Sequence, residues 1–176
     1  MQALAEISNN IPLSMTKQQS FYFQIGQISV GFSNLESQIN ELIYILTKSD
    51  DEFINSILLE GNSISQNLKL LLKLSRYHEI EEEKIKALHS SIDKIRINRN
   101  LFIHGLWSLH ETENDLVFVC ETKKVEFKKV TLGFVKILNN FLEFKSEDLE
   151  EELSQIKNCS KIAREIIDTL QKSRYW

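Results

Sequence analysis

Hydrophobic residues recur at helical spacing over the first part of the chain. From Phe21 to Leu46 they follow one another in alternating steps of four and three, which is the spacing of one face of an α-helix. The pattern predicts one long helix from about Thr16 to Lys48. At about 1.5 Å per residue such a helix is roughly 50 Å long, so we expect it to pack lengthwise against another helix. The positions are Phe21, Ile25, Ile28, Phe32, Leu35, Ile39, Leu42 and Leu46.

Two glycines, Gly26 and Gly31, lie inside this predicted helix. A glycine in a helix interior costs up to about 1 kcal/mol relative to alanine. Either the glycines let another helix approach closely, or they are simply tolerated.

Three shorter helical patterns follow. Phe53 to Leu58 predicts a short helix that ends near Gly61, and Asn62 and Ser63 are candidate N-caps of the next helix, which carries Ile64, Leu68, Leu71, Leu72 and Tyr77. The acidic run Glu81 to Glu83 suits the first turn of a third helix. That helix is predicted to continue to His104 and to stop at Gly105.

The period then changes from helical to alternating. Residues 116–119 and 125–127 flank Thr122-Lys123-Lys124 and predict a hairpin, and Trp107 to Leu109 could add a third strand. Residues 131–145 fit either a helix or a second hairpin turning at Asn139-Asn140. We favour strands there.

The chain closes with a long predicted helix. Ser146 followed by Glu147 and Asp148 is a helix-start signal. A heptad-like stripe continues from it through Leu149, Leu153, Ile156, Ala163, Ile167 and Leu170. The elements together predict a mainly α fold, a helical bundle with a small antiparallel β insert before the last helix. We expect one domain over residues 1–176, with a loose N-terminal arm at 1–15 and a strand-rich insert at 107–145.

Composition and charge exclude several classes of fold and function for this chain. A single proline and five glycines favour helices over a turn-rich sandwich. The net charge of −4 argues against a broad nucleic-acid coat, which needs clustered Lys and Arg. Cys120 and Cys159 lack metal-ligand spacing and are expected to be reduced structural thiols. No apolar run is long enough to span a membrane, and the first residues do not resemble a secretory leader. We expect a cytoplasmic protein without a membrane partner.

One arginine stands in the apolar stripe of the helix that ends at His104. On an ideal helix, the hydrophobic residues that lie within roughly 60° of Arg99 are Ile85, Leu88, Ile92, Ile95, Phe102 and Ile103. Burying a guanidinium costs several kcal/mol unless it is paired, so Arg99 needs an explanation. The candidates are a buried acidic partner, a subunit interface or a bound phosphate.

A polar strip lies beside this stripe, formed by His89, Asp93, Arg96, Asn100 and His104. Asn100 and His104 are four residues apart, so the amide could orient the imidazole. Metal-free RNA cleavage needs a proton acceptor and positive charge on the phosphorane, which histidine and arginine supply. The structural alternative is an ion pair of Asp93 with Arg96 or Arg99. No Gly-rich phosphate loop or HExxH motif points to nucleotide hydrolysis or metalloprotease chemistry.

Two further features allow an RNA-binding or a structural interpretation. Trp107 could stack on a base, although a core position is commoner for a tryptophan that leads into a hairpin. Lys123 and Lys124 belong to a group of lysines in the insert, with Lys128, Lys129 and Lys136. These lysines could face RNA, or they could blunt a solvated sheet edge.

The segment Arg99-Asn100-Leu101-Phe102-Ile103-His104 resembles the signature of the HEPN superfamily, an arginine and a polar residue followed by a histidine. A His104-Gly105-Leu106-Trp107 continuation and a last helix opened by Ser146 add to the resemblance, which spans most of residues 16–172. It implies a bundle of long antiparallel helices that dimerises with the two motifs facing each other. Toxins of this group that pair with a nucleotidyltransferase carry a tyrosine where this chain has Leu106, which argues against such a partner.

The resemblance implies a metal-independent endoribonuclease without a cofactor, acting as a homodimer on an RNA substrate. Arg99, Asn100 and His104 would be catalytic: Arg99 steadies the phosphate, His104 transfers the proton and Asn100 holds His104. Arg96, Trp107, Lys123 and Lys124 would bind RNA. Many members are toxins or antiphage effectors, so an antitoxin or another regulatory protein is a further expected partner. The alternative is an inactive HEPN-like dimerisation or interaction module.

Overall fold

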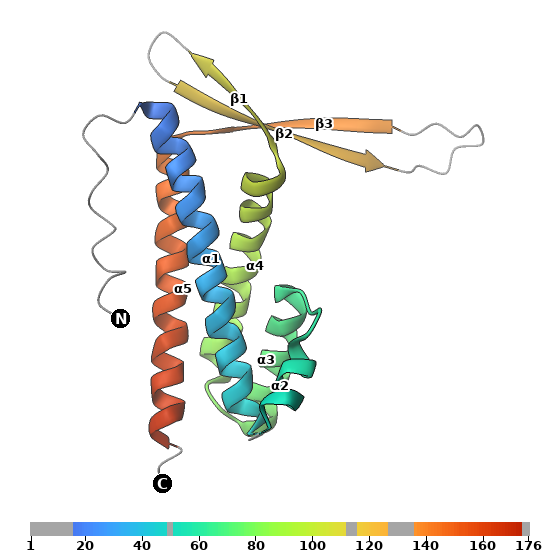
Figure 1. Ribbon diagram of the computed structural model, residues 1–176, viewed down its shortest axis with the longest axis vertical. Coiled ribbons are helices and arrows are strands. Elements are labelled where there is room, and N and C mark those ends of the chain that lie inside the picture. The colour runs from blue at the N-terminus through green and yellow to red at the C-terminus, as the bar shows by residue number, and fades with distance from the viewer. Residues whose placement is uncertain (1–15, 49–50, 112–115, 127–135, 174–176) are drawn as a thin grey trace, which may run out of the picture.

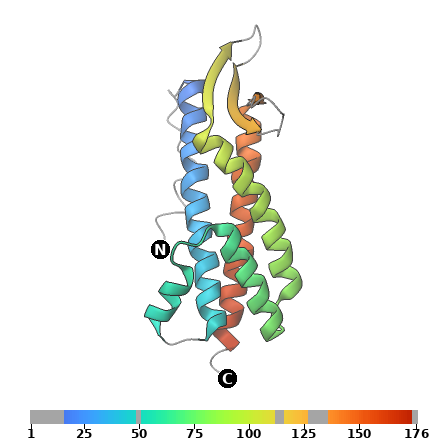
Figure 2. The same cartoon turned by 90° about the vertical axis from the view of Figure 1, so that its right-hand side faces the viewer.

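Three long helices form the body of the described part of the protein. A small sheet crosses one end of them (Figure 1, Figure 2). The computed structural model describes residues 16–48, 51–111, 116–126 and 136–173. The elements in these ranges are α1 (Lys17–Thr47), α2 (Glu52–Leu59), α3 (Ile64–His78), α4 (Glu82–His104), β1 (Leu106–Glu111), β2 (Leu116–Glu126), β3 (Lys136–Phe144) and α5 (Ser146–Ser173). The predicted mainly α class with a small antiparallel insert is confirmed.

The two longest helices, α1 and α5, pack lengthwise, as the length of α1 predicted. Near their first turns Gln24 Nε2 donates a hydrogen bond to Glu150 Oε1 at 3.4 Å. Towards their other ends Arg164 Nη1 lies 3.6 Å from Glu41 Oε2. These contacts make α1 and α5 parallel, whereas α4 has the expected antiparallel direction against both of them (Figure 1). The reason is that α4 returns the chain to the end where α1 begins, and α5 starts there after the sheet.

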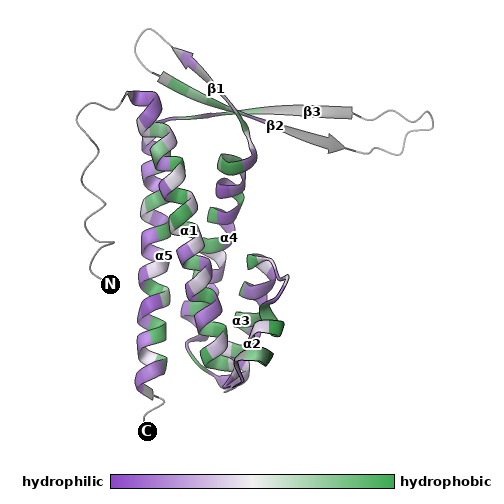
Figure 3. Ribbon diagram, in the orientation of Figure 1, coloured by the Kyte–Doolittle hydropathy of each residue, from purple (hydrophilic) through white to green (hydrophobic). Residues whose placement is uncertain are grey.

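The core fills the space between these helices and α3, and each long helix alternates hydrophobic and hydrophilic faces (Figure 3). All predicted positions of the α1 stripe are buried except Ile25, which is partly buried. At Gly31 an added Cβ would lie 3.2 Å from Ile156 Cγ2, so this glycine permits the close approach of α5. At Gly26 nothing lies within 4 Å of such an atom, so that glycine is merely tolerated.

Side chains cap the first three helices. Ser63 caps α3 as predicted: its hydroxyl accepts a hydrogen bond from the backbone N–H of Gln66, and the Gln66 side chain accepts one from the Ser63 N–H. Thr16 and Gln19 form the same reciprocal arrangement at the start of α1. Such a capping box satisfies two N–H groups that a helix start otherwise leaves unpaired.

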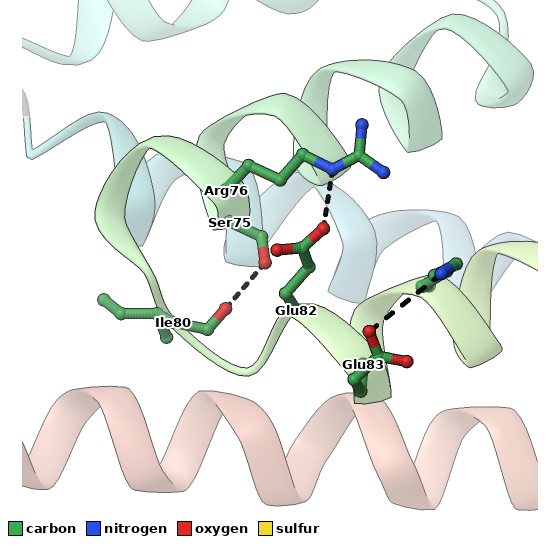
Figure 4. A network of polar contacts seen from close by, with 6 residues as sticks. Ser75, Arg76, Ile80, Glu82 and Glu83 are labelled. Carbon is green, nitrogen blue, oxygen red and sulfur yellow. Dashed lines mark hydrogen bonds and ion pairs between the residues drawn. The ribbon is translucent and has the colours of Figure 1, made fainter.

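A short turn folds α4 back against α3, and two polar contacts hold it (Figure 4). Ser75 Oγ donates a hydrogen bond to the Ile80 carbonyl at 2.6 Å. Arg76 Nε lies 2.7 Å from Glu82 Oε1 and donates to it. Glu82 and Glu83 lie in the first turn of α4, as the acidic run predicted.

The sheet has the order β1-β2-β3, with both pairs antiparallel. The predicted strand at Trp107 is confirmed within β1, but the predicted turn at residues 122–124 is wrong. Thr122 and Lys123 lie inside β2, opposite Asn140 and Asn139 of β3. Thr-Lys-Lys offers no residue suited to a positive φ, and threonine favours a strand. The predicted second hairpin at Asn139-Asn140 is therefore also wrong, because β3 is one continuous strand.

Two sequence predictions fall partly or wholly on residues that the structure does not describe. The N-terminal arm, residues 1–15, lies outside the described residues, and so does the part of the ambiguous stretch at 131–135. Within the described ranges, no helix combines the length and apolar character that a membrane span requires.

Candidate functional site

Arg99 lies partly buried on α4, on the side that meets α1. Its Cζ is 5.6 Å from the centroid of the Phe32 ring, which places the guanidinium over an aromatic face. Its Nη1 donates a hydrogen bond of 3.3 Å to Oδ1 of the neighbouring Asn100. The Nε atom is buried and has no hydrogen-bond partner. The charge thus lies between α4 and α1, in what we call the helix seam, formed by Arg99 and Asn100 of α4 and Phe32 of α1. Its N–H donors are only partly satisfied.

Glu36 of α1 is an acidic residue whose pKa the charge of Arg99 influences. The sequence analysis did not identify it. Burial raises the pKa of the Glu36 carboxyl, and the positive charge of Arg99 offsets part of that rise. No acidic side chain of the described residues forms an ion pair with Arg99. The available signal was that Glu36 follows Phe32 by four residues and therefore shares its face of α1.

Asp93 satisfies a different arginine. Its Oδ1 lies 2.9 Å from Nη2 of Arg96 and accepts a hydrogen bond of 3.0 Å from Nε of the same residue. The structural alternative for Asp93 therefore holds for Arg96 and not for Arg99. Both side chains are at least 30% exposed, so the pair contributes at most about 1 kcal/mol.

The predicted catalytic set is brought together only in part. Asn100 accepts the hydrogen bond from Arg99, and among the described residues no hydrogen bond joins Asn100 to His104. His104 is the exposed last residue of α4. The expected orientation of His104 by Asn100 is absent because the amide turns back towards the seam.

Trp107 is partly buried and packs against the hydrophobic core. Its ring centroid is 5.1 Å from that of Phe21 and 5.6 Å from that of Phe144. Its Nε1–H donates a hydrogen bond of 3.0 Å to the Phe102 carbonyl. These contacts satisfy its polar atom and pack one part of its ring against the core, which favours the structural interpretation of this residue.

The remaining predicted RNA-binding residues, Lys123 and Lys124, lie in β2. Their backbones stand opposite Asn139 and Leu138 of β3. Their side chains lie outside what the structure describes.

The junction after His104 depends on Gly105 and on a buried thiol. Gly105 has φ −72° and ψ 152°, so the helix does not stop there through a left-handed glycine. An added Cβ would instead collide with Cys120 Sγ and lie 2.6 Å from the Leu101 carbonyl oxygen. Cys120 and Cys159 are free and buried, and burial raises the pKa of both thiols. The prediction of reduced structural thiols is confirmed in these respects.

The short helix α2 buries a polar side chain and exposes several hydrophobic ones. Its polar Asn55 is only 7% exposed and accepts a hydrogen bond of 2.9 Å from Thr47 Oγ1. Most of the helix is coloured hydrophobic in Figure 3, yet four of its large side chains face outward. These four form what we call the α2 surface: Phe53 (71% exposed), Ile54 (53%), Ile57 (51%) and Leu58 (39%). The sequence predicted the helix but not which of its sides faces the bundle.

Comparison with known proteins adds one similarity. The chain is 27% identical over 171 residues to a protein of the yeast Debaryomyces hansenii named mediator of RNA polymerase II transcription subunit 14. The match covers 97% of this chain and spans only 14% of that protein. No family model matches the chain, and no solved structure matches it. The resemblance to the HEPN superfamily therefore stays a prediction.

This similarity corrects the functional prediction made from the motif. The similar protein is named as a transcription subunit and not as a nuclease, so the predicted endoribonuclease and the predicted role in toxin–antitoxin systems or phage defence are contradicted. The geometry of the seam is in line with this correction. Arg99 contacts Phe32 and Asn100, and none of these contacts includes His104. An arginine and a histidine at the right spacing do not by themselves form a site.

Proposed function

We propose that this chain is a non-catalytic protein-interaction domain that binds another subunit of a protein complex through the α2 surface. The observation that carries the proposal is the exposure of four large hydrophobic side chains on one eight-residue helix. Scattered exposed hydrophobic residues are normal on protein surfaces, but a contiguous group of them marks an interaction site. The similar protein is itself named as a subunit, which supports the same class of role.

The energetics of the α2 surface favour a protein partner. Fully burying a side chain such as Phe53 or Ile57 stabilises an association by about 1.5 to 3 kcal/mol. A few side chains of this kind, clustered at the centre of an interface, usually supply most of its binding free energy. The inward position of Asn55, fixed by Thr47, holds α2 in the orientation that presents these side chains.

In this proposal Arg99 has a structural role and not a catalytic one. Its guanidinium links α4 to α1 through Phe32. The alternative of an inactive interaction module, which the motif left open, is in line with this arrangement. The expected homodimer and the expected cytoplasmic location stay predictions, which light scattering and cell fractionation test.

The test compares Ile57→Asp with Ile97→Asp. Both isoleucines are 51% exposed, so each substitution adds the same charge to a helix surface, but Ile97 lies on α4, outside the α2 surface. The tagged wild-type chain is purified from its native cells, stoichiometric partners are identified, and the complex is rebuilt from purified components. Ile57→Asp should weaken binding at least tenfold and Ile97→Asp should leave it unchanged.

Two results would contradict the proposal. In the first, the wild-type chain purifies without any stoichiometric partner. In the second, the chain is a homodimer that Ile57→Asp breaks, which would assign the α2 surface to a second copy of the chain. Circular dichroism of both variants checks that each remains folded.

A further inference from the structure

A cavity of about 270 Å³ lies where α4, β3 and α5 meet. We call it the acidic pocket because four carboxylates line it, those of Glu143, Asp148, Glu151 and Glu152, beside Asn98 and Phe144. Two elements supply the carboxylates: Glu143 is the penultimate residue of β3, and the other three lie in the first turns of α5. The strand leads directly into the helix at this junction (Figure 1), so the fold itself gathers these charges.

Glu152 is the most deeply placed of these carboxylates and is only 4% exposed. Its Oε2 accepts a hydrogen bond of 3.0 Å from Asn98 Nδ2, whereas its Oε1 is buried without a partner. A buried polar atom left without a hydrogen bond costs about 1 to 3 kcal/mol. The pocket therefore contains a strong acceptor that lacks a donor.

Two of the other carboxylates of the pocket accept hydrogen bonds from neutral donors. Asp148 Oδ2 accepts a hydrogen bond of 2.7 Å from the backbone N–H of Lys145, and Glu151 Oε1 accepts one of 3.2 Å from Gln155 Nε2. None of the ion pairs in the described part of the chain includes a carboxylate of the acidic pocket. Four carboxylates that form no ion pair among the described residues make this pocket complementary to a positively charged ligand.

The size and lining of the pocket indicate the kind of cation. Among the described residues, no group of three or more acidic, histidine or cysteine side chains is arranged to hold a metal ion. The volume lies just below the range of about 300 to 1,000 Å³ of small-molecule sites, which suits one side chain better than a cofactor. Phe102 and Phe144 also line the pocket and offer aromatic rings beside the carboxylates.

We infer that the acidic pocket binds the guanidinium group of an arginine side chain on a protein partner. A guanidinium carries five N–H donors in a planar fork, which can serve several carboxylates at once and can stack on a phenyl ring. An ammonium group lacks this planar geometry. That the arginine comes from a protein rests on the proposed function, whereas the affinity of the pocket for guanidinium does not.

The test uses a small probe and the isolated full chain. The ¹⁵N-labelled protein is titrated with N-acetyl-L-arginine amide at constant ionic strength, and in parallel with the lysine and citrulline derivatives. Citrulline has the shape of arginine without its charge. We expect saturable shifts of the Asn98 side-chain amide and of the backbone near Glu152 with the arginine derivative, and at least threefold weaker binding of the other two.

Variants locate the binding. Glu151→Gln should weaken binding of the arginine derivative at least threefold, whereas Glu147→Gln, which removes the same charge one turn earlier on α5 outside the pocket, should leave it unchanged. Equal shifts with citrulline, no saturation, tighter binding of lysine, or equal effects of the two variants would each overturn the inference.

The outcome is separable from the test of the α2 surface. The Ile57→Asp variant should bind the arginine derivative as the wild type does, because Ile57 lies on α2, outside the pocket lining. Failure of the probe leaves the α2 surface test intact. Absence of a protein partner overturns the proposed function while the affinity of the pocket remains measurable.

Discussion

The guanidinium of Arg99 lies over the ring of Phe32, with 5.6 Å between Cζ and the ring centroid, and it joins α4 to α1 across the helix seam. Glu36 lies one turn further along α1, and the charge of Arg99 lowers the pKa of its carboxyl. Phe32, Glu36 and Arg99 thus join the packing of α1 against α4 to one charge and one titrating carboxyl. The pKa of Glu36 can be measured on the isolated chain, without knowledge of any partner.

The first prediction concerns the pKa of Glu36. Burial raises it and Arg99 lowers it, so Arg99→Met should raise the pKa of Glu36 further above its wild-type value. A ¹³C NMR titration of the Glu36 side-chain carboxyl measures this. Arg96→Met is the matched control, because the Arg96 guanidinium pairs with Asp93. Equal shifts in the two variants would show that the effect is a change in net charge and not the proximity of Arg99.

The second prediction concerns stability and pH. Burial raises the pKa of Glu152 above the ordinary value of 4.5, so the folded chain takes up a proton at a higher pH than the unfolded chain. The contribution of this group to stability therefore falls as pH rises from the unfolded pKa through the raised folded pKa. Glu152→Gln removes the cost of the buried charge and should raise the free energy of unfolding at pH 7 by about 1 kcal/mol.

Urea denaturation at pH 7 and pH 5 tests this sign. The advantage of Glu152→Gln over the wild type should shrink at the lower pH, where the wild-type carboxyl is more protonated. Glu147→Gln, with its exposed side chain, should show no comparable change. A Glu152→Gln variant that is less stable than the wild type at both pH values would rule out the assigned burial cost.

The third prediction compares two glycines. Gly105→Ala should lower the free energy of unfolding by about 1 to 3 kcal/mol, because the added methyl group meets Cys120 Sγ and the Leu101 carbonyl. Gly26→Ala should raise it by about 0.5 to 1 kcal/mol, because open space surrounds that helix-interior position. Thermal melts of the two variants decide, and changes of the same sign would contradict the packing at Gly105.

The sequence predicted those features that depend on neighbours along the chain. The α1 stripe and the Ser63 cap are periodic or local signals, and they are present in the structure. The angular map of α4 also placed Ile95 and Phe102 correctly in the core, but it failed at Ile103, which is 38% exposed. The helix ends at the next residue, so its last turn leaves the bundle for the sheet.

Features that depend on distant segments could not be predicted from local patterns. Glu36 and Arg99 are separated by two helices, and only the fold of α4 against α1 brings them together. The acidic pocket likewise needs Asn98 of α4 beside Glu152 of α5. In α2, the side that faces the bundle is decided by the contact of Asn55 with Thr47, and hydrophobic residues on both sides of so short a helix do not reveal it.

The last prediction concerns the two thiols. Cys120 is fully buried and Cys159 is 2% exposed, and burial raises the pKa of both, so each has little thiolate and little access to reagents. Ellman's reagent should leave both thiols unmodified in the native protein and modify both after unfolding in urea. The native rate should follow the free energy of unfolding, so Gly105→Ala should speed modification and Gly26→Ala should slow it. Modification of either thiol in the native chain at the rate of free glutathione would contradict the packing of Cys120 beneath α4 or of Cys159 within α5.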